Sequence, residues 1–179
     1  LYRFCALKTL ENKNTYNEKF IKKIANSITL KKLQNKKLYS PEVAKLSSII
    51  AKKPYVRKAL KGFQINFIKK SKLVVVEGRD IGSKIMPNAD LKLFFTCSTK
   101  EKAKRRLKEF KNLNKKITLK KVEKALIQRD KEDTKRKISP LIMTKNAVLV
   151  DTTKLSIKEL DIKLKKLVKK AIIKKYGNL

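Results

Sequence analysis

The sequence contains no histidine and no tryptophan, and it has only four glycines, four prolines and two cysteines among 179 residues. Without histidine, neither a His-ligated metal site nor a histidine general base is possible. Cys5 and Cys97 are too far apart along the chain to form the short spacing of a zinc or redox motif. The few glycines and prolines exclude collagen-like chains, low-complexity chains and small turn-rich scaffolds.

Long hydrophobic runs are also missing, and the longest are a few residues, such as 73–76. A helix that crosses a bilayer needs about 20 apolar residues, so no segment of this chain could span a membrane. The first residues do not combine a charged segment with an apolar one, and we expect no signal peptide. These features predict a cytoplasmic protein with no membrane partner.

The chain is rich in lysine, and its formal net charge is +34. Hydrophobic residues make up 41% of the sequence, which is enough to build the core of one domain. The lysines are spread along the whole chain and form no single arm or stripe. Since motifs such as a zinc finger or a helix-turn-helix are missing, we expect nucleic acid to bind only non-specifically.

Arginine is rare beside 42 lysines, and its positions are therefore informative. The planar guanidinium donates two parallel hydrogen bonds to a phosphate or a carboxylate, whereas the lysine ammonium acts as a point charge. This pattern is typical of a protein that binds phosphorylated ligands. The seven arginines are Arg3, Arg57, Arg79, Arg105, Arg106, Arg129 and Arg136.

Helical patterns fill the first 70 residues. Apolar residues recur at helical spacing in 2–10 and in 16–26, and 28–39 is a lysine-rich connection. Ser40 followed by Pro41 is typical of a helix start, and Pro54 opens the next helix.

Short apolar runs alternate with helical patterns in the rest of the chain. The runs 73–77, 91–95 and 147–150 predict buried parallel strands. Capping-box patterns at Ser98 and Ser156 predict helix starts after two of them. The sequence therefore predicts an α/β fold whose ligands bind at the carboxyl ends of the strands. A further helix is predicted from Thr118 to about Asp130.

Several short motifs follow one another in an order that resembles bacterial cytidylate kinase. The most specific is the spacing of Arg129, Asp133 and Arg136, and the turn 76–82 matches a "GRDIG" strand end. Together the motifs cover nearly the whole chain. The others lie at residues 1–3, 48, 54–60, 87–90, 102–106, 139–141 and 151–156.

The resemblance implies a P-loop nucleoside monophosphate kinase-like fold, with a parallel sheet flanked by helices. It implies a core domain from 1–27 and 71–179 with a lid around 105–136, and a CMP-binding subdomain over 28–70. The implied reaction transfers a phosphoryl group from ATP, with Mg²⁺, to CMP or dCMP in pyrimidine metabolism. We expect the protein to be a monomer.

The resemblance also implies which residues bind the nucleoside of CMP. Ser48 and Arg57 lie at positions that donate hydrogen bonds to the cytosine ring, and Asp80 accepts one from its amine. Asp133 and Arg129 match residues close to the ribose hydroxyls.

Five arginines are assigned to phosphate by the same resemblance. Arg3, Arg79 and Arg136 match the residues that bind the monophosphate of CMP. Arg105 and Arg106, with Arg136, match catalytic arginines that neutralise the phosphoryl group during transfer.

The loop that would bind the ATP phosphates is not found in these 179 residues. A P-loop needs two glycines four residues apart, followed by Lys and Ser or Thr, and no pair among Gly62, Gly78, Gly82 and Gly177 fits. The ATP-binding residues are therefore unknown, and the resemblance implies an N-terminally incomplete enzyme. The central first strand, between the strands 73–77 and 91–95, would be missing too. We expect the chain alone to be poorly stable and inactive.

Two other interpretations stay open at this point. One is a different nucleoside monophosphate kinase, acting for example on adenylate or uridylate. The other is a basic nucleic-acid-binding protein or a non-catalytic remnant, whose affinity would fall steeply with salt and would show no preference among mononucleotides.

Overall fold

In a computed structural model, the chain forms two compact units, and most contacts lie within one unit or the other. The structure describes residues 1–13, 16–112 and 117–177. Unit 1 comprises Leu1–Glu77 with Lys135–Ile138, and unit 2 comprises Gly78–Thr134 with Ser139–Leu179. The division into a core domain and a CMP-binding subdomain stays a prediction.

Unit 1 is helical, as the sequence predicts. Asn17 accepts a hydrogen bond from the Phe20 amide at 2.9 Å, and Ser40 accepts one from the Val43 amide at 3.2 Å. These caps satisfy amides that have no partner inside the helix and so fix where each helix begins. The four main helices are α1 (Tyr2–Glu11), α2 (Glu18–Asn26), α4 (Pro41–Ile50) and α5 (Pro54–Lys69).

The lysine-rich connection 28–39 is more ordered than the sequence predicts. It contains the short helix α3 (Leu30–Leu33) and the 3₁₀-helix η1 (Lys36–Tyr39). The Leu38 side chain is buried and joins the core of unit 1. A helix of one turn has too few residues to show a periodic pattern, so these two short helices could not be predicted from the sequence.

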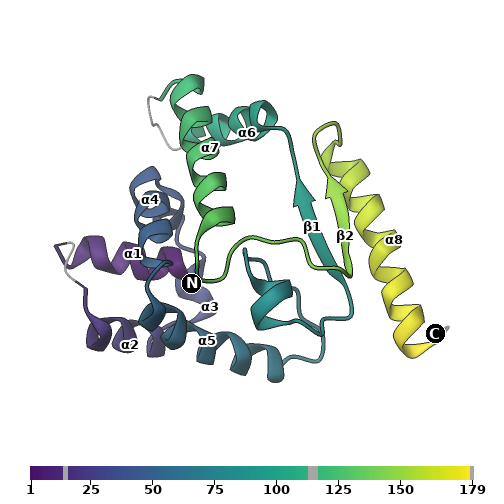
Figure 1. Ribbon diagram of the computed structural model, residues 1–179, viewed down its shortest axis with the longest axis horizontal. Helices are drawn as coiled ribbons and strands as arrows, with labels where there is room; N and C mark the ends of the chain where they lie inside the picture. The colour runs from purple at the N-terminus through teal and green to yellow at the C-terminus, as the bar shows by residue number, and fades with distance from the viewer. Residues whose placement is uncertain (14–15, 113–116, 178–179) are drawn as a thin grey trace. The chain divides into compact units, whose positions relative to one another are not determined.

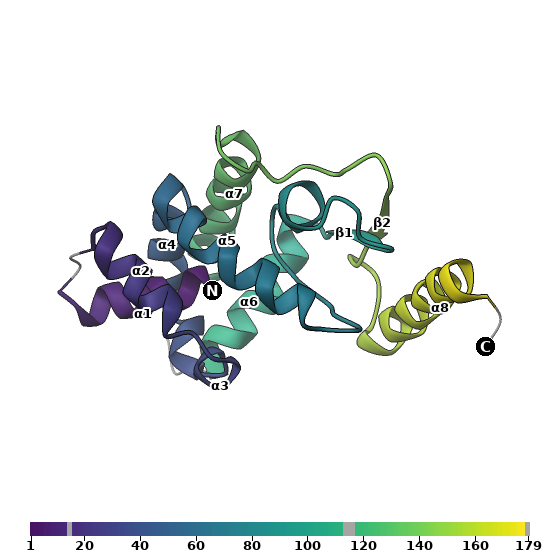
Figure 2. The ribbon, with the colours of Figure 1, turned by 90° about the horizontal axis from the view of Figure 1, so that it is seen from below.

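The core of unit 1 lies among α1, α2, α4 and α5, which are drawn side by side in Figures 1 and 2. Ile21, Ile50 and Leu60 have no exposed surface. Each such side chain stabilises the fold by about 1.5–3 kcal/mol. Cys5 is also fully buried, and burial raises the pKa of its thiol to about 11, so the thiol is uncharged at neutral pH.

Thr9 is the exception in this core, because its buried hydroxyl has no hydrogen-bond partner among the described residues. We expect Thr9→Val to raise the free energy of unfolding by about 1 kcal/mol, since valine has the same shape and no polar group to desolvate. Urea denaturation checks this. Thr29→Val serves as the control, because the Thr29 hydroxyl caps α3 and its loss should destabilise.

Unit 2 contains a two-stranded parallel sheet, which confirms two of the three predicted strands. Strand β1 (Lys92–Thr96) pairs with β2 (Ala147–Asp151), and Figure 1 shows the two side by side. In this register Leu93 lies opposite Val148 and Thr96 lies opposite Asp151. Both strands therefore end at the same edge, where the polar residues that follow them meet.

The predicted strand 73–77 is wrong for the described structure. These residues, which belong to unit 1, form no strand, and the exposed fractions of Leu73 and Val75 are 79% and 99%. A strand needs a neighbouring strand with which to form backbone hydrogen bonds. Among the described residues, no strand pairs with 73–77. The small parallel sheet agrees with a nucleoside monophosphate kinase fold only at the level of an α/β protein, and the expected missing central strand stays a prediction.

Three long helices complete unit 2 and confirm the predicted helix starts. Ser156 and Glu159 form the predicted capping box of the last one. None of the described helices is both long and apolar enough to cross a membrane. The helices are α6 (Thr99–Asn112), α7 (Leu119–Lys135) and α8 (Ile157–Tyr176), with the π-helical turn η2 (Ile81–Ile85) before β1.

Candidate functional site

A buried carboxylate lies against two arginines in unit 2. The Arg79 Nε donates to Asp133 Oδ2 at 2.8 Å, and the Arg129 Nε lies 3.8 Å from the same oxygen. The Asp133 side chain is only 7% exposed, whereas that of Arg79 is 44% exposed. Arg129 and Asp133 are one helical turn apart on α7, and Arg79 comes from the turn before η2. The carboxylate thus holds Arg79 by a charge-assisted hydrogen bond and Arg129 by an ion pair, so that two positive charges lie close together.

The turn that carries Arg79 has a tightly defined backbone. The carbonyl of Asp80 accepts hydrogen bonds from the amides of Lys84 at 2.8 Å and Ile85 at 3.3 Å, which begins η2. A Cβ at Gly78 would lie 2.8 Å from the Ile81 side chain, so a larger residue here would require Ile81 to shift. Asp80 is itself buried, and its role in reading the cytosine amine stays a prediction.

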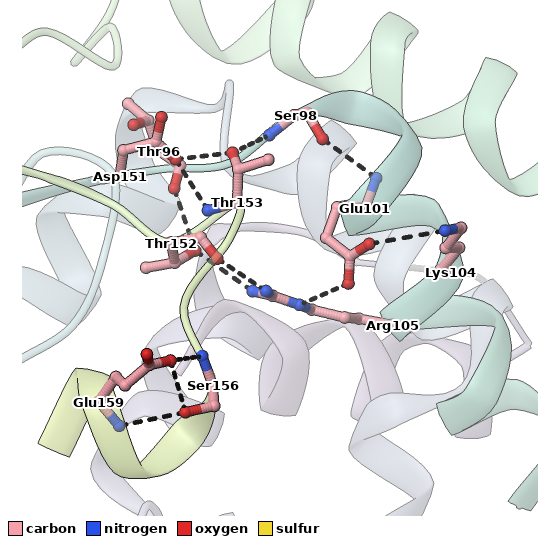
Figure 3. A network of polar contacts seen from close by, with 10 residues as sticks. All are labelled: Thr96, Ser98, Glu101, Lys104, Arg105, Asp151, Thr152, Thr153, Ser156 and Glu159. Carbon is pink, nitrogen blue, oxygen red and sulfur yellow. Dashed lines mark hydrogen bonds and ion pairs between the residues drawn. The ribbon is translucent and has the colours of Figure 1, made fainter.

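Arg105 links the start of α6 to the end of the sheet (Figure 3). Its Nη1 donates to the Thr152 hydroxyl at 3.2 Å, and its Nη2 donates to the Thr152 carbonyl at 2.8 Å. Its Nε donates to Glu101 at 3.3 Å. Thr152 is buried, and its hydroxyl and amide both donate to the Thr96 carbonyl at the end of β1. One guanidinium therefore joins α6 to both strands.

A second link at the same edge involves Asp151 and Thr153 (Figure 3). The Asp151 carboxylate accepts from the Thr153 hydroxyl at 2.6 Å and from its amide at 2.8 Å. These hydrogen bonds hold the pKa of Asp151 below its ordinary value. The Thr153 hydroxyl oxygen accepts from the Ser98 amide at 2.9 Å, which ties β2 to the residue that caps α6.

We expect Arg105→Lys to loosen α6, because a single ammonium cannot make the three contacts of the guanidinium. The Arg105 side chain is 43% exposed, so solvent screens it, and the free energy of unfolding should fall by only about 0.5–1 kcal/mol. Hydrogen exchange of the 99–105 amides should become faster. Lys104→Arg, on the neighbouring position, is the control and should leave exchange unchanged.

Arg106, the other predicted catalytic arginine of α6, lies in a different environment. It pairs with Glu109 on the next turn, and its guanidinium carbon lies 4.4 Å from the centre of the Phe110 ring. Its side chain is only 16% exposed. These contacts fix Arg106 along the helix, and its catalytic role stays a prediction.

The remaining site residues belong to unit 1. Arg3 donates from Nη1 to the Leu38 carbonyl at 3.2 Å, and Arg57 donates from Nε to the Ala51 carbonyl at 2.7 Å. Ser48 is half-buried on α4, and Arg136 follows α7 in the segment 135–138.

Unit 2 thus brings together Arg79, Arg129 and Asp133. Arg105 contacts a different set of residues, Thr152 and Glu101. Sequence reasoning missed the central role of Thr152, although the polar residues after β2 were a signal for it. It also missed Glu101, whose carboxylate contacts Arg105.

A metal site is not formed by the described residues, which contain no group of three Cys, Asp or Glu side chains that could hold an ion. Magnesium in nucleotide sites is usually held by one or two carboxylates together with phosphates. The described residues therefore do not fit a magnesium ion held by the protein alone.

The parallel strands, the flanking helices and the arginine–carboxylate cluster are consistent with an α/β protein of the nucleoside monophosphate kinase class. The family model for cytidylate kinase matches residues 1–170. The chain belongs to the cytidylate kinase family.

Individual relatives agree with this assignment. Cytidylate kinase of Thermotoga maritima is 42% identical over 133 residues, which are 74% of this chain and 60% of the relative. Cytidylate kinase of Thermosipho africanus is 35% identical over 178 residues, 94% of this chain and 79% of the relative. The bifunctional pantoate ligase/cytidylate kinase of Trichodesmium erythraeum is 47% identical over 126 residues, 70% of this chain and 24% of the relative. The chain spans about 60% of the length of the Thermotoga relatives that it matches.

Proposed function

We propose that the polypeptide binds CMP or dCMP and serves in the transfer of the γ-phosphoryl group of ATP to it. The observation that carries the proposal is the match of the cytidylate kinase family over residues 1–170. The cluster of Arg79, Arg129 and Asp133 supports it, because the buried Asp133 carboxylate orients Arg79, whose guanidinium can bind the phosphate of CMP, next to Arg129.

In the proposed reaction, a phosphate oxygen of CMP attacks the γ-phosphorus of ATP. The bond from that phosphorus to the bridging oxygen breaks, ADP leaves, and CDP or dCDP forms. No covalent enzyme intermediate is needed, so the protein acts by alignment and by neutralising charge.

The proposed roles of the residues follow the family resemblance. Arg3, Arg79 and Arg136 bind the monophosphate, and Arg105, Arg106 and Arg136 neutralise the group in transfer. Each guanidinium can donate two parallel hydrogen bonds to phosphate oxygens. It therefore orients the phosphate and also neutralises part of its charge.

The nucleoside is read by groups of matching polarity. Ser48 and Arg57 donate to the cytosine ring, and Asp80 accepts from its amine. Asp133 and Arg129 lie close to the ribose. UMP carries a carbonyl where CMP carries the amine, so Asp80 would face an acceptor and UMP should bind less well.

We also propose that the protein works as a cytoplasmic monomer that binds nucleic acid only non-specifically. Cys5 and Cys97 are both free thiols, which suits a reducing compartment.

Isothermal titration calorimetry with CMP, UMP and AMP tests the proposal on the 179-residue chain. We expect CMP to bind at least about 10-fold more tightly than UMP, since an unmatched polar group costs about 1–3 kcal/mol. Arg57→Ala should reduce this preference, because one of the groups that read the cytosine ring is lost while Asp80 remains, and Lys58→Ala, at the exposed neighbouring position on α5, should keep it.

Two results would contradict the proposal. Equal binding of AMP and CMP would favour another monophosphate kinase. Failure to bind any mononucleotide, together with RNA binding that falls steeply with salt, would favour the basic nucleic-acid-binding protein.

A further inference from the structure

Each of the two arginines of unit 1 that come from helices α1 and α5 is held by one carbonyl group and one tyrosine ring. The Arg57 Nε donates to the Ala51 carbonyl at the end of α4 at 2.7 Å. The Arg57 guanidinium carbon lies 5.4 Å from the centre of the Tyr2 ring. Tyr2 is half-buried and packs against the core, so its ring has a fixed place.

Arg3 has the same pair of contacts. Its Nη1 donates to the Leu38 carbonyl at 3.2 Å, and its guanidinium carbon lies 5.2 Å from the centre of the Tyr39 ring. Leu38 and Tyr39 are the last residues of η1, and the buried Leu38 side chain anchors that turn in the core. The segment 28–39 is therefore more than a connection, because it supplies a carbonyl and a ring that contact Arg3.

Two such contacts are enough to orient a guanidinium group. The ring attracts the cation at its face, and the carbonyl fixes the direction of one N–H bond. An arginine side chain otherwise samples many rotamers, and ordering it on a ligand costs conformational entropy. A guanidinium that is already oriented loses less freedom when a ligand arrives, so its affinity is higher.

We propose that Tyr2 and Tyr39 are positioning residues for the acceptor nucleotide, acting through Arg57 and Arg3. The inference rests on the proposed function, in which Arg57 donates to cytosine and Arg3 binds the monophosphate. Neither tyrosine needs to touch the nucleotide. The two tyrosines should therefore affect binding differently. Tyr2, through Arg57, controls the preference for one base over another, and Tyr39, through Arg3, controls how much the phosphate adds to the binding affinity.

Calorimetric titration of the full chain with CMP, UMP and cytidine separates the two effects. We expect Tyr2→Leu to lower CMP affinity about 3–10-fold and to reduce the CMP-over-UMP preference by the same factor. We expect Tyr39→Leu to lower CMP affinity by a similar factor, to reduce the CMP-over-cytidine preference and to leave the CMP-over-UMP preference unchanged. Tyr2→Phe and Tyr39→Phe keep the aromatic ring, so both preferences should stay as they are in the unaltered chain.

A matched control is Tyr55→Leu. Tyr55 packs against the same core, and within the described part of the chain no arginine lies over its ring. Tyr55→Leu should therefore leave both the CMP-over-UMP and the CMP-over-cytidine preference unchanged. A purely structural role for Tyr2 would lower the affinity for all three ligands equally, and that result would overturn the proposal.

A second measurement does not depend on CMP binding. In ¹H–¹⁵N spectra of the free chain, the Arg57 Nε–H should exchange slowly with water, and Tyr2→Leu should make the exchange at least about 5-fold faster. If the unaltered chain binds no CMP, the proposed function fails, and this exchange alone decides whether Tyr2 orients Arg57. Unchanged exchange in Tyr2→Leu would overturn the proposed role of Tyr2.

Discussion

Replacing Asp133 with alanine is expected to lower the CMP affinity of the chain by about 100-fold. The Asp133 carboxylate is nearly buried, with Arg79 at 2.8 Å and Arg129 at 3.8 Å. Without it, the two guanidinium groups repel each other, and Arg79 loses the hydrogen bond that orients it. Losing a charge-assisted contact at a binding site costs about 2–3 kcal/mol, which corresponds to the expected change in affinity.

The same substitution should lower the free energy of unfolding by about 2 kcal/mol. Removing one partner of a fully buried ion pair costs about 3–5 kcal/mol. The Arg79 side chain is 44% exposed, so water screens part of the unpaired charge and the expected cost is smaller. Urea denaturation and calorimetric titration with CMP measure the two effects separately.

Asp130→Ala provides the matched control on the same helix. Asp130 pairs with Lys102 at 2.7 Å, but both side chains are more than one third exposed. Such a pair contributes about 0–1 kcal/mol, and CMP binding should not change. Equal effects of Asp130→Ala and Asp133→Ala would show that the cluster has no special role.

The helices could be predicted from the sequence because their start signals are local. Ser40 with Pro41, and Ser156 with Glu159, cap the helices where the pattern indicates. The sequence could not show in this way that residues 73–77 form no strand. An apolar run becomes a strand only when another strand lies beside it. The exposed Val75 shows that the apolar pattern alone does not form one.

The site was predictable only in part, and for a similar reason. Residues 79 and 133 are 54 positions apart, and no periodic pattern connects them. Their pairing was not predicted, because the resemblance assigned Arg79 to the phosphate of CMP and Asp133 to its ribose. The stacking of Arg57 on Tyr2 was not predicted at all, because it depends on how α1 and α5 pack within unit 1.

ATP-dependent phosphorylation of CMP is expected to rise at least about 10³-fold when a segment that carries a P-loop is joined ahead of residue 1. The 179 residues contain no pair of glycines with the P-loop spacing. The backbone amides and lysine of that loop align the donor phosphates, and such positioning accounts for most of the catalysis in phosphoryl transfer. A coupled assay of ADP formation measures the rise, and a P-loop Lys→Ala variant of the added segment is the control.

The added segment should also change the structure of residues 73–76. The resemblance puts a central strand between this run and the strand that forms β1. A strand at that place would pair with the backbone of 73–76 and cover side chains such as Leu73 and Val75, which are 79% and 99% exposed in the chain alone. Hydrogen exchange of the 73–76 amides should therefore slow in the fusion, and it should slow equally in the fusion with the P-loop Lys→Ala variant. Activity without protection of 73–76 would mean that the donor site forms without the central strand, and protection without activity would mean that the strand forms but the arginines do not align the acceptor.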